Sequence, residues 1–116
     1  MTNDCLFCRI VAGEIPATVV HETDRTLAFR DIGPKAPVHI LVIPKAHHRD
    51  VAELATADPA LAGEVLRICA VVAEAEGLPE RGYRVLFNVG EHGGQEVFHV
   101  HAHILGGKPL GPMVAP

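Results

Sequence analysis

Three histidines, His99, His101 and His103, alternate with apolar residues near the end of the chain. An alternation with a period of two is typical of a β-strand, so we expect a strand over residues 99–105 with the three imidazoles on one face. Histidine is costly to bury without a partner. Three of them on one face of an apolar strand therefore indicate a chemical role.

Two kinds of chemistry suit such a row of histidines. Imidazole is an effective nucleophile toward phosphorus and leaves readily, so it can split one displacement into two easier steps. A neighbouring histidine can protonate the leaving group, and another can fix the tautomer of the attacking ring. Alternatively, a His-x-His strand presents neutral imidazoles that suit zinc. A purely structural row is the least favoured interpretation, and spacing alone does not choose between nucleophile and metal.

A second group of potential metal ligands lies near the N-terminus. Cys5 and Cys8 form a Cys-x-x-Cys motif on one turn of a short helix predicted over residues 5–12. Such a pair is half a zinc site, a redox pair or two small buried residues, and the redox interpretation is least favoured because no βαβ pattern surrounds it. The polar loop over residues 45–49 offers further histidines as ligands.

The elements that must position these groups follow from the hydrophobic pattern. A long helix begins with Asp58 as N-cap and Pro59 at its first position, and its apolar spacing continues to Gly77. The order α-β-β-β-α-β-β predicts an α+β domain with a mainly antiparallel sheet. One sheet with one long helix leaves surface uncovered, which favours a dimer. The predicted strands span residues 19–22, 26–31, 38–43, 83–89 and 99–105.

Three further features could belong to a ligand site. Asp31 ends an apolar strand face and is either an acceptor for a ligand's hydroxyl groups or a strand-end cap. His39 interrupts an otherwise apolar central strand, where a structural histidine is the commoner case. The glycine-containing loop over residues 90–96 leads straight into the histidines, and its backbone N–H groups could approach a phosphate closely.

The length and composition of the chain limit its fold class and its possible functions. The chain has 116 residues, 48% of them hydrophobic, which indicates one globular domain over residues 1–116. Its net charge of −4 argues against a protein that binds nucleic acid through a basic surface. We find no membrane-spanning apolar segment and no signal-peptide pattern, so we expect a cytoplasmic protein whose three cysteines are reduced.

The chain resembles the histidine triad (HIT) family, specifically its Hint-like branch of nucleotide-binding phosphoramidases. The resemblance covers nearly the whole chain and rests on residues 99–105, which match the family's specific His-φ-His-φ-His-φ-φ signature. It implies a five-stranded antiparallel sheet with one short N-terminal helix and one long helix, and two subunits that join into a ten-stranded sheet. The supporting matches are residues 29–32, 36–39, 41–45, 94–95 and 106–107, and Asn88.

The resemblance also implies a hydrolase that cleaves purine nucleoside 5′-phosphoramidates, such as adenosine phosphoramidates. His101 would attack the α-phosphorus and form a nucleotidyl-imidazole intermediate, which water then hydrolyses. His103 would bind phosphate or assist proton transfer, and His39 would orient the nucleophile. His99 is a further candidate catalytic residue.

The implied substrate contacts surround this nucleophile. Asp31 would accept hydrogen bonds from the ribose hydroxyl groups, and Phe29 and Ile32 would help to wall the base pocket. The other implied contacts to ribose and phosphate come from Asn88, Gly94, Gln95, Glu96, His101 and His103.

A structural zinc ion follows from the same resemblance, because many similar bacterial members bind one. The matching ligands are Cys5, Cys8, His47 and His99, with His48 as the alternative to His47. Two thiolates and two imidazoles make a closed tetrahedral site. This role conflicts with the use of His99 as a proton donor. No organic cofactor is implied.

Two departures from the family pattern bear on the substrate. Glu96 stands where well-known Hint proteins carry a serine that contacts phosphate, and a carboxylate there should weaken binding of dianionic groups. The C-terminal tail lacks a tryptophan found in some members. Two alternative functions remain: a dinucleoside polyphosphate hydrolase, and a non-catalytic purine-nucleotide sensor or scaffold. A nucleotidylyltransferase is less favoured, because that group carries glutamine where this chain has His103.

Overall fold

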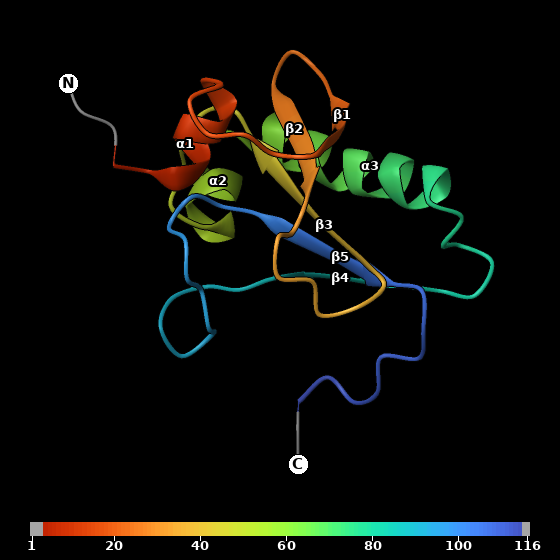
Figure 1. The fold of residues 1–116 in the computed structure, drawn as a ribbon. Coiled ribbons are helices and arrows are strands. Elements are labelled where there is room, and N and C mark those ends of the chain that lie inside the picture. The colour runs from red at the N-terminus through yellow and green to blue at the C-terminus, as the bar shows by residue number, and fades with distance from the viewer. Residues whose placement is uncertain (1–3, 115–116) are drawn as a thin grey trace.

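Five strands form one antiparallel sheet in the spatial order β1-β2-β3-β5-β4 (Figure 1). The computed structural model describes residues 4–114 of the chain. Every neighbouring pair of strands in the sheet is antiparallel, which confirms the predicted α+β class and sheet. The strands are β1 (Val19–Glu22), β2 (Thr26–Arg30), β3 (Val38–Pro44), β4 (Arg84–Phe87) and β5 (Ala102–Gly106).

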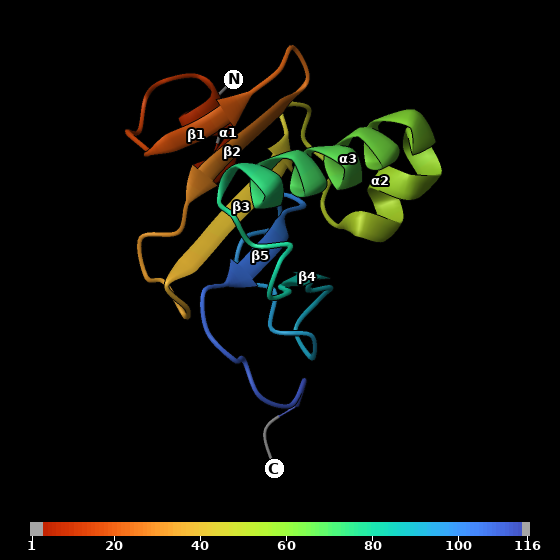
Figure 2. The ribbon, with the colours of Figure 1, turned by 90° about the vertical axis from the view of Figure 1, so that its right-hand side faces the viewer.

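The central strand β3 is apolar apart from His39, because both of its faces are covered. Ile40 and Val42 face one hydrophobic cluster, and Leu41 and Ile43 face another. The first cluster lies under the long helix α3 (Pro59–Ala75), and the second under the short helix α1 (Leu6–Val11). Figure 2 shows α3 lying across the sheet. The histidines share the α1 side.

Helix α3 is the predicted long helix. The Asp58 carboxylate accepts a hydrogen bond from the Leu61 N–H at 3.1 Å, and Pro59 occupies the first helical position. These are the expected signals of a helix start, since the N–H of that first position has no partner within the helix. Its buried stripe comprises Leu61, Val65, Ile68, Cys69, Val72 and Ala73. Cys69 is thus a core residue, as its place in the stripe predicted.

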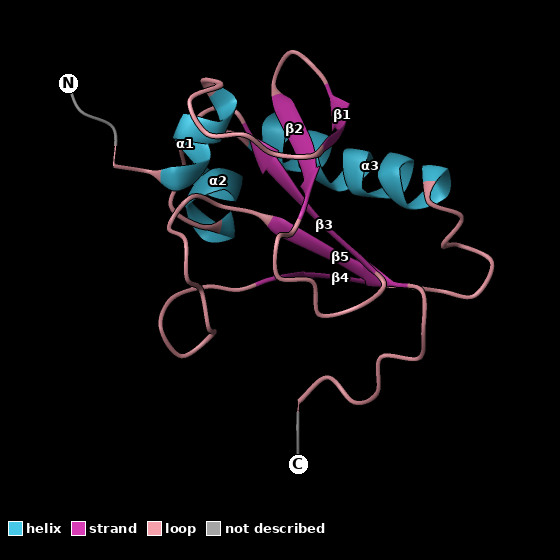
Figure 3. Cartoon of the chain, in the orientation of Figure 1, coloured by secondary structure: helices cyan, strands magenta, loops and turns pink. Residues whose placement is uncertain are grey.

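One helix was not among the predicted elements. Helix α2 (Val51–Ala57) precedes α3, and Figure 3 shows it as a separate helical segment. It buries Leu54 alone, so it has no apolar periodicity that a sequence pattern could reveal. Its signal is in the cap: Asp50 accepts from the Glu53 N–H at 2.9 Å, and Glu53 accepts from the Arg49 N–H at 3.0 Å.

The strand that carries the histidines is shorter than the predicted 99–105. It begins at Ala102, so that His103 alone of the three lies within β5. Pro44 ends β3 and has no N–H to continue the ladder, and the Val100 N–H donates instead to the His48 carbonyl at 2.8 Å. The predicted alternation nevertheless holds through this segment, because Val100, Ala102 and Ile104 are buried in the α3-side cluster.

Two other differences lie at strand ends. Strand β2 ends at Arg30, so Asp31 follows the strand, and its N–H donates to the His39 carbonyl at 3.0 Å. Strand β4 ends at Phe87, so Asn88 also lies just beyond its strand. Across residues 4–114 no helix is long and apolar enough to cross a membrane.

Candidate active site

His101 lies immediately before β5, and the residue is only 8% exposed. Its Nδ1 lies 2.8 Å from the main-chain carbonyl of His99, which can only accept, so Nδ1 carries the proton. Burial lowers the pKa of His101, against the smaller opposing effects of the Asp31 and Glu96 charges. The ring is therefore neutral at pH 7, and Nε2 keeps the lone pair that a nucleophile needs.

His39 and His103 form a chain of hydrogen bonds beside His101, which we call the relay. The Lys35 N–H donates to His39 Nδ1 at 3.1 Å, so His39 Nε2 carries the proton. That Nε2–H donates to His103 Nδ1 at 2.9 Å. The proton of neutral His103 is therefore on Nε2. Strand register explains the meeting, since His39 pairs with Leu105 and His103 with Leu41 on adjacent strands.

The outer end of the relay is a buried donor that lacks a partner. His103 Nε2 makes no hydrogen bond among the described residues, although it is inaccessible to solvent. Burial, followed by the neighbouring His101 and His39, lowers the pKa of His103 to about 4. The ring centroids of His101 and His103 lie 4.8 Å apart. A ring with a lone pair on Nε2 and a ring with an unsatisfied Nε2–H are thus neighbours, an arrangement that suits attack on a phosphoryl group whose oxygen the N–H would bind.

His99 has a different environment, in a group that we call the Cys/His cluster: Cys5, Cys8, His47 and His99. Its Nε2 donates to the Pro44 carbonyl at 2.8 Å, so Nδ1 keeps the lone pair. That Nδ1 lies 3.3 Å from Cys5 Sγ and 3.4 Å from Cys8 Sγ, and His47 Nδ1 lies 3.5 Å from Cys8 Sγ. Four potential ligand atoms lie within 4.8 Å of one another, so the cluster could hold a metal ion.

A family model described as the HIT domain matches residues 12–110 of the chain. A purine nucleoside phosphoramidase of Escherichia coli K12 is 44% identical over 99% of this chain and 97% of its own length. The structure of a HIT family hydrolase from Clostridium thermocellum superposes with a TM-score of 0.92, at 40% identity, covering 99% of this chain and all of its own. The chain belongs to the HIT family. A second HIT family hydrolase structure, from Legionella pneumophila, is 51% identical with a TM-score of 0.89, covering 93% of this chain and 96% of its own. These relatives support a hydrolase.

The residues predicted to contact the ribose and the base differ in their exposure and in their distance from the histidines. Asp31 has one carboxylate oxygen 2.7 Å from the Gly33 N–H, which donates to it, and the other 3.6 Å from His39 Nε2. It therefore lies beside the relay. Phe29 is 4% exposed and packs against Phe7 with ring centroids 5.4 Å apart, whereas Ile32 is fully exposed. Their contact with a base stays a prediction.

The loop before the histidines is held by Gln95, whose side chain is buried. Its Oε1 accepts from the Gly90 N–H at 2.9 Å, and its Nε2 donates to the carbonyls of Arg49 at 2.7 Å and Val97 at 3.1 Å. Both amide protons are thus used within the protein, and any hydrogen-bond donation from this residue to phosphate would come from its main chain. Asn88 is half-buried, while Gly94 and Glu96 are exposed.

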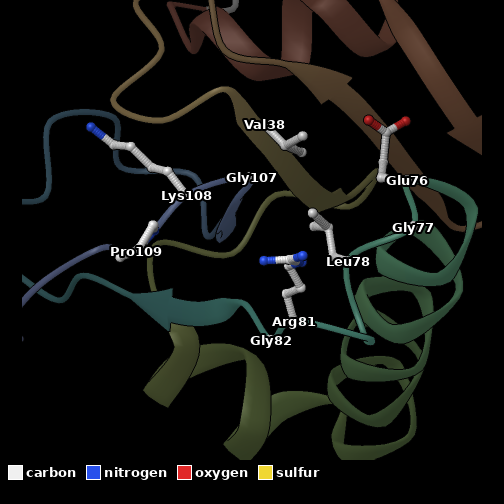
Figure 4. Close-up of a pocket in the computed structure, with 9 residues that line it drawn as sticks. All are labelled: Val38, Glu76, Gly77, Leu78, Arg81, Gly82, Gly107, Lys108 and Pro109. Atoms are coloured by element: carbon white, nitrogen blue, oxygen red, sulfur yellow. The ribbon is translucent and has the colours of Figure 1, made fainter.

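A cavity of about 630 Å³ lies away from these groups, where β3 begins and β5 ends (Figure 4). None of the histidines lines it. Its walls come from the end of α3, the turn that follows and the chain after β5, and Figure 4 shows the Arg81 and Lys108 side chains at its sides. The lining residues are Val38, Glu76, Gly77, Leu78, Arg81, Gly82, Gly107, Lys108 and Pro109. The candidate chemistry therefore belongs to the histidine face and not to this cavity.

Sequence reasoning did not find three positioning contacts: the main chain of Lys35, the carbonyl of Pro44 and the ring of Phe7. The first two act through the backbone, so no side-chain pattern could have pointed to them. Phe7 had a signal, since it stands between the two cysteines of the Cys-x-x-Cys motif.

Proposed function

We propose that this HIT protein hydrolyses purine nucleoside 5′-phosphoramidates through a covalent intermediate on His101. The observation that carries the proposal is that the His101 ring, with its lone pair on Nε2, lies next to the His103 ring, whose Nε2–H has no partner among the described residues. The 44% identical relative named purine nucleoside phosphoramidase supports the substrate class.

In the first step His101 Nε2 attacks the α-phosphorus, and a P–N bond forms on the enzyme as the bond to the leaving amine breaks. The leaving nitrogen either takes a proton from His103 Nε2 or is already protonated in the substrate, and it departs as the neutral amine. The His101 Nδ1–H stays on the His99 carbonyl, which stabilises the positive charge that the ring acquires. The His103 N–H, while present, binds a non-bridging phosphoryl oxygen.

In the second step water attacks the same phosphorus. The bond to His101 breaks and the nucleoside monophosphate leaves. The attacking water loses a proton, which returns to His103 if His103 gave one to the leaving group. His39 keeps His103 in the tautomer that donates from Nε2. Because each ring returns to its starting state, the cycle needs no external acid, base or reductant.

The substrate would lie across the histidine face. Asp31 would accept from the ribose hydroxyl groups, and Phe29 and Ile32 would contact the base. Ribose and phosphate would meet Asn88, Gly94, the main chain of Gln95, and Glu96. The position of Asp31 beside the relay supports this role, because one of its oxygens lies 3.6 Å from His39 Nε2.

The Cys/His cluster fits a structural Zn²⁺ ion. In a tetrahedral site with Zn–S of about 2.3 Å and Zn–N of about 2.05 Å, sulfur and nitrogen ligands lie about 3.6 Å apart. The observed separations of 3.3, 3.4 and 3.5 Å are close to this value. The His99 N–H on the Pro44 carbonyl is the kind of support that metal-binding histidines require. Bound zinc would link α1 to the loop after β3.

His47, and not His48, is the proposed histidine ligand from that loop. His47 Nδ1 lies in the cluster, whereas His48 Nδ1 lies 3.9 Å from a Glu53 carboxylate oxygen. With His99 bound to zinc, proton transfer falls to His103 or to the leaving group.

We also expect the single HIT domain over residues 1–116 to pair with a second copy. Strand β4 is an edge strand, and its outer N–H and C=O groups could continue the ladder into a ten-stranded sheet. Light scattering of the purified protein would test this expectation.

A substrate panel tests the function. Adenosine and guanosine phosphoramidates are compared with diadenosine polyphosphates, and the enzyme is quenched for intact-mass detection of an adduct on His101. We expect turnover of the phosphoramidates and a nucleotidyl adduct that is absent in His101→Asn. His21→Asn, which changes a histidine on β1 outside the site, is the matched control.

Each other outcome identifies a different function. Preferential cleavage of the dinucleotides would replace the proposal with a polyphosphate hydrolase. Binding of AMP without turnover of any substrate would replace it with a non-catalytic sensor or scaffold.

A further inference from the structure

We propose that Phe7 is a positioning residue that couples the Cys/His cluster to His101, so that an ion bound at the cluster holds the nucleophile in place. The inference rests on the proposed function only in taking His101 as the nucleophile.

The first observation is the place of the Phe7 ring. It is 5% exposed, and its centroid lies 5.1 Å from that of His101 at an interplanar angle of 86°. It also lies 6.0 Å from the His99 ring at 67° and 5.4 Å from Phe29 at 77°. One aromatic side chain thus touches both the candidate nucleophile and a candidate metal ligand in near-perpendicular contacts, the geometry that aromatic pairs favour.

The second observation is how little else fixes α1. The helix has six residues, far fewer than an isolated helix needs for stability in water. In the described part of the chain, the main-chain hydrogen bonds of residues 5–14 join that segment to itself. Its placement on the sheet therefore depends on side chains: the apolar contacts of Phe7, Ile10 and Val11, and the two cysteines of the cluster.

The third observation is that Phe7 stands between those cysteines. Cys5 is the N-cap of α1 and Cys8 lies in its first turn, where its N–H donates to Cys5 Sγ at 3.3 Å. An ion held by both sulfurs would fix this turn against His99 and His47. Phe7 would then be fixed with it, because it shares the same turn of backbone.

A separate connection runs through His99 itself. Its ring belongs to the cluster, while its carbonyl accepts the His101 Nδ1–H at 2.8 Å. The cluster therefore reaches the nucleophile from two sides: through the main chain of His99, which fixes the tautomer, and through Phe7, which packs against the ring. Losing the ion would loosen both.

The test uses the full chain and follows the ring of His101 directly. Nitrogen NMR of ¹⁵N-histidine-labelled protein reports the His101 tautomer and the exchange rate of its Nδ1 proton, with and without one equivalent of Zn²⁺. In zinc-loaded wild type we expect the Nδ1–H tautomer with slow exchange. Chelation of the metal should speed that exchange about tenfold or more, since local opening exposes the proton.

Two variants separate positioning from simple packing. Phe7→Ala, loaded with zinc, should show the fast exchange of the stripped protein and a 10- to 100-fold lower kcat, roughly the cost of a small misplacement, with KM changed less than about twofold. Ile10→Ala is the matched control, because it removes a half-buried, non-aromatic α1 side chain that packs against the same cluster. It should leave the exchange rate and kcat near wild type. Phe7→Leu should be intermediate and decides the matter if the alanine variant does not fold.

Two results would overturn the coupling: an unchanged His101 signal after metal removal, or equal effects of Phe7→Ala and Ile10→Ala. Failure of the proposed function looks different, since wild type would then turn over no phosphoramidate while the exchange data still depended on zinc and Phe7.

Discussion

His99 and His101 are the same residue type two positions apart in the segment that leads into β5, yet they present opposite nitrogens to their surroundings. His99 donates from Nε2 to the Pro44 carbonyl and turns Nδ1 toward two thiols. His101 donates from Nδ1 to the His99 carbonyl and keeps Nε2 available. The comparison teaches that a main-chain carbonyl selects the role of each ring, by choosing which nitrogen keeps its lone pair.

Both rings must be neutral for this selection to matter. His99 is fully buried and His101 nearly so, and burial is the main cause of the lowered pKa in each case. Because the same desolvation acts on both, it does not distinguish them. The distinction comes from the surroundings of each ring. The lone pair of His99 faces the thiols of the Cys/His cluster, whereas the ring of His101 lies beside the relay.

The largest expected effect comes from removing each of the two rings in turn. His101→Ala should reduce turnover by at least about 10⁴-fold while the zinc content stays at one per chain, because the nucleophile is lost and the cluster is intact. His99→Ala should lose zinc and thermal stability, but it retains the main-chain carbonyl that fixes His101. Turnover assays with elemental analysis of both variants provide the measurement. A His99→Ala protein that kept its zinc would contradict the assignment.

The relay gives the next largest effect. In His39→Ala the His103 Nδ1 loses its donor, so His103 no longer keeps its proton on Nε2. We expect kcat to fall about 10²-fold, the lower end for loss of an acid–base helper. His39→Gln should recover part of this loss, because the amide can place an N–H near the lost Nε2–H. Equal activities for the two variants would argue against tautomer control.

Much of this arrangement could be predicted from the sequence. The alternation at residues 99–105 indicated which side chains share a face, and Asp58 and Pro59 marked the start of α3 correctly. These two signals depend on side-chain type and local spacing, which a sequence displays directly. The family resemblance, and not spacing, implied the set of Cys5, Cys8, His47 and His99, which the structure brings together.

The remainder depends on contacts that no local pattern encodes. The strand begins late because the Val100 N–H finds the His48 carbonyl, a partner 52 residues away. Gln95 matched a family motif for phosphate contact, yet its amide holds the loop to the Arg49 carbonyl. Helix α2 lacked periodicity because Leu54 is its one buried residue. Tertiary hydrogen bonds decide the first two cases, whereas the signal for α2 was its cap at Asp50.

The pH dependence should separate this site from an ordinary exposed histidine. Catalysis needs neutral rings, and burial lowers the pKa of His103 to about 4 and lowers that of His101. At pH 5 a histidine of pKa 6.5 would be only about 3% neutral, a loss of about thirtyfold, whereas His103 should stay largely neutral. Because the pKa of His101 is also lowered, the acid limb of kcat/KM should lie below pH 6.5. A limb at 6.5 or above would show that the rings titrate as if exposed.

The free energy of unfolding should also depend on pH, because the pKa of His103 is lowered in the native protein. Between about pH 6.5 and pH 4 the unfolded chain binds a proton at residue 103 that the native protein excludes. The free energy of unfolding should therefore decrease as the pH falls through that window and stop responding to this residue below about pH 4. Denaturant titrations of wild type and His103→Gln would show a weaker pH dependence in the variant.

The smallest expected effect concerns substrate choice, and it involves the loop over residues 90–96 and not the relay. Glu96 is exposed, and its charge acts to raise the pKa of His101, so the carboxylate lies within electrostatic reach of the phosphorus that the nucleophile attacks. A unit charge about 4 Å away in water contributes about 1 kcal/mol, or about fivefold. Glu96→Gln should therefore raise kcat/KM for diadenosine polyphosphates by about threefold to fivefold and leave phosphoramidates with a neutral or cationic leaving group unchanged.

Salt and a neighbouring acid provide the controls for that change. The gain should shrink above about 0.5 M salt, since exposed charges are screened over a few ångströms there. Glu91→Gln removes an exposed acid from the same loop and should have little effect on either substrate. Equal gains for both substrate classes would mean that Glu96 acts on the nucleophile itself. A gain confined to the polyphosphates would identify this carboxylate as the feature that biases the site toward amine leaving groups.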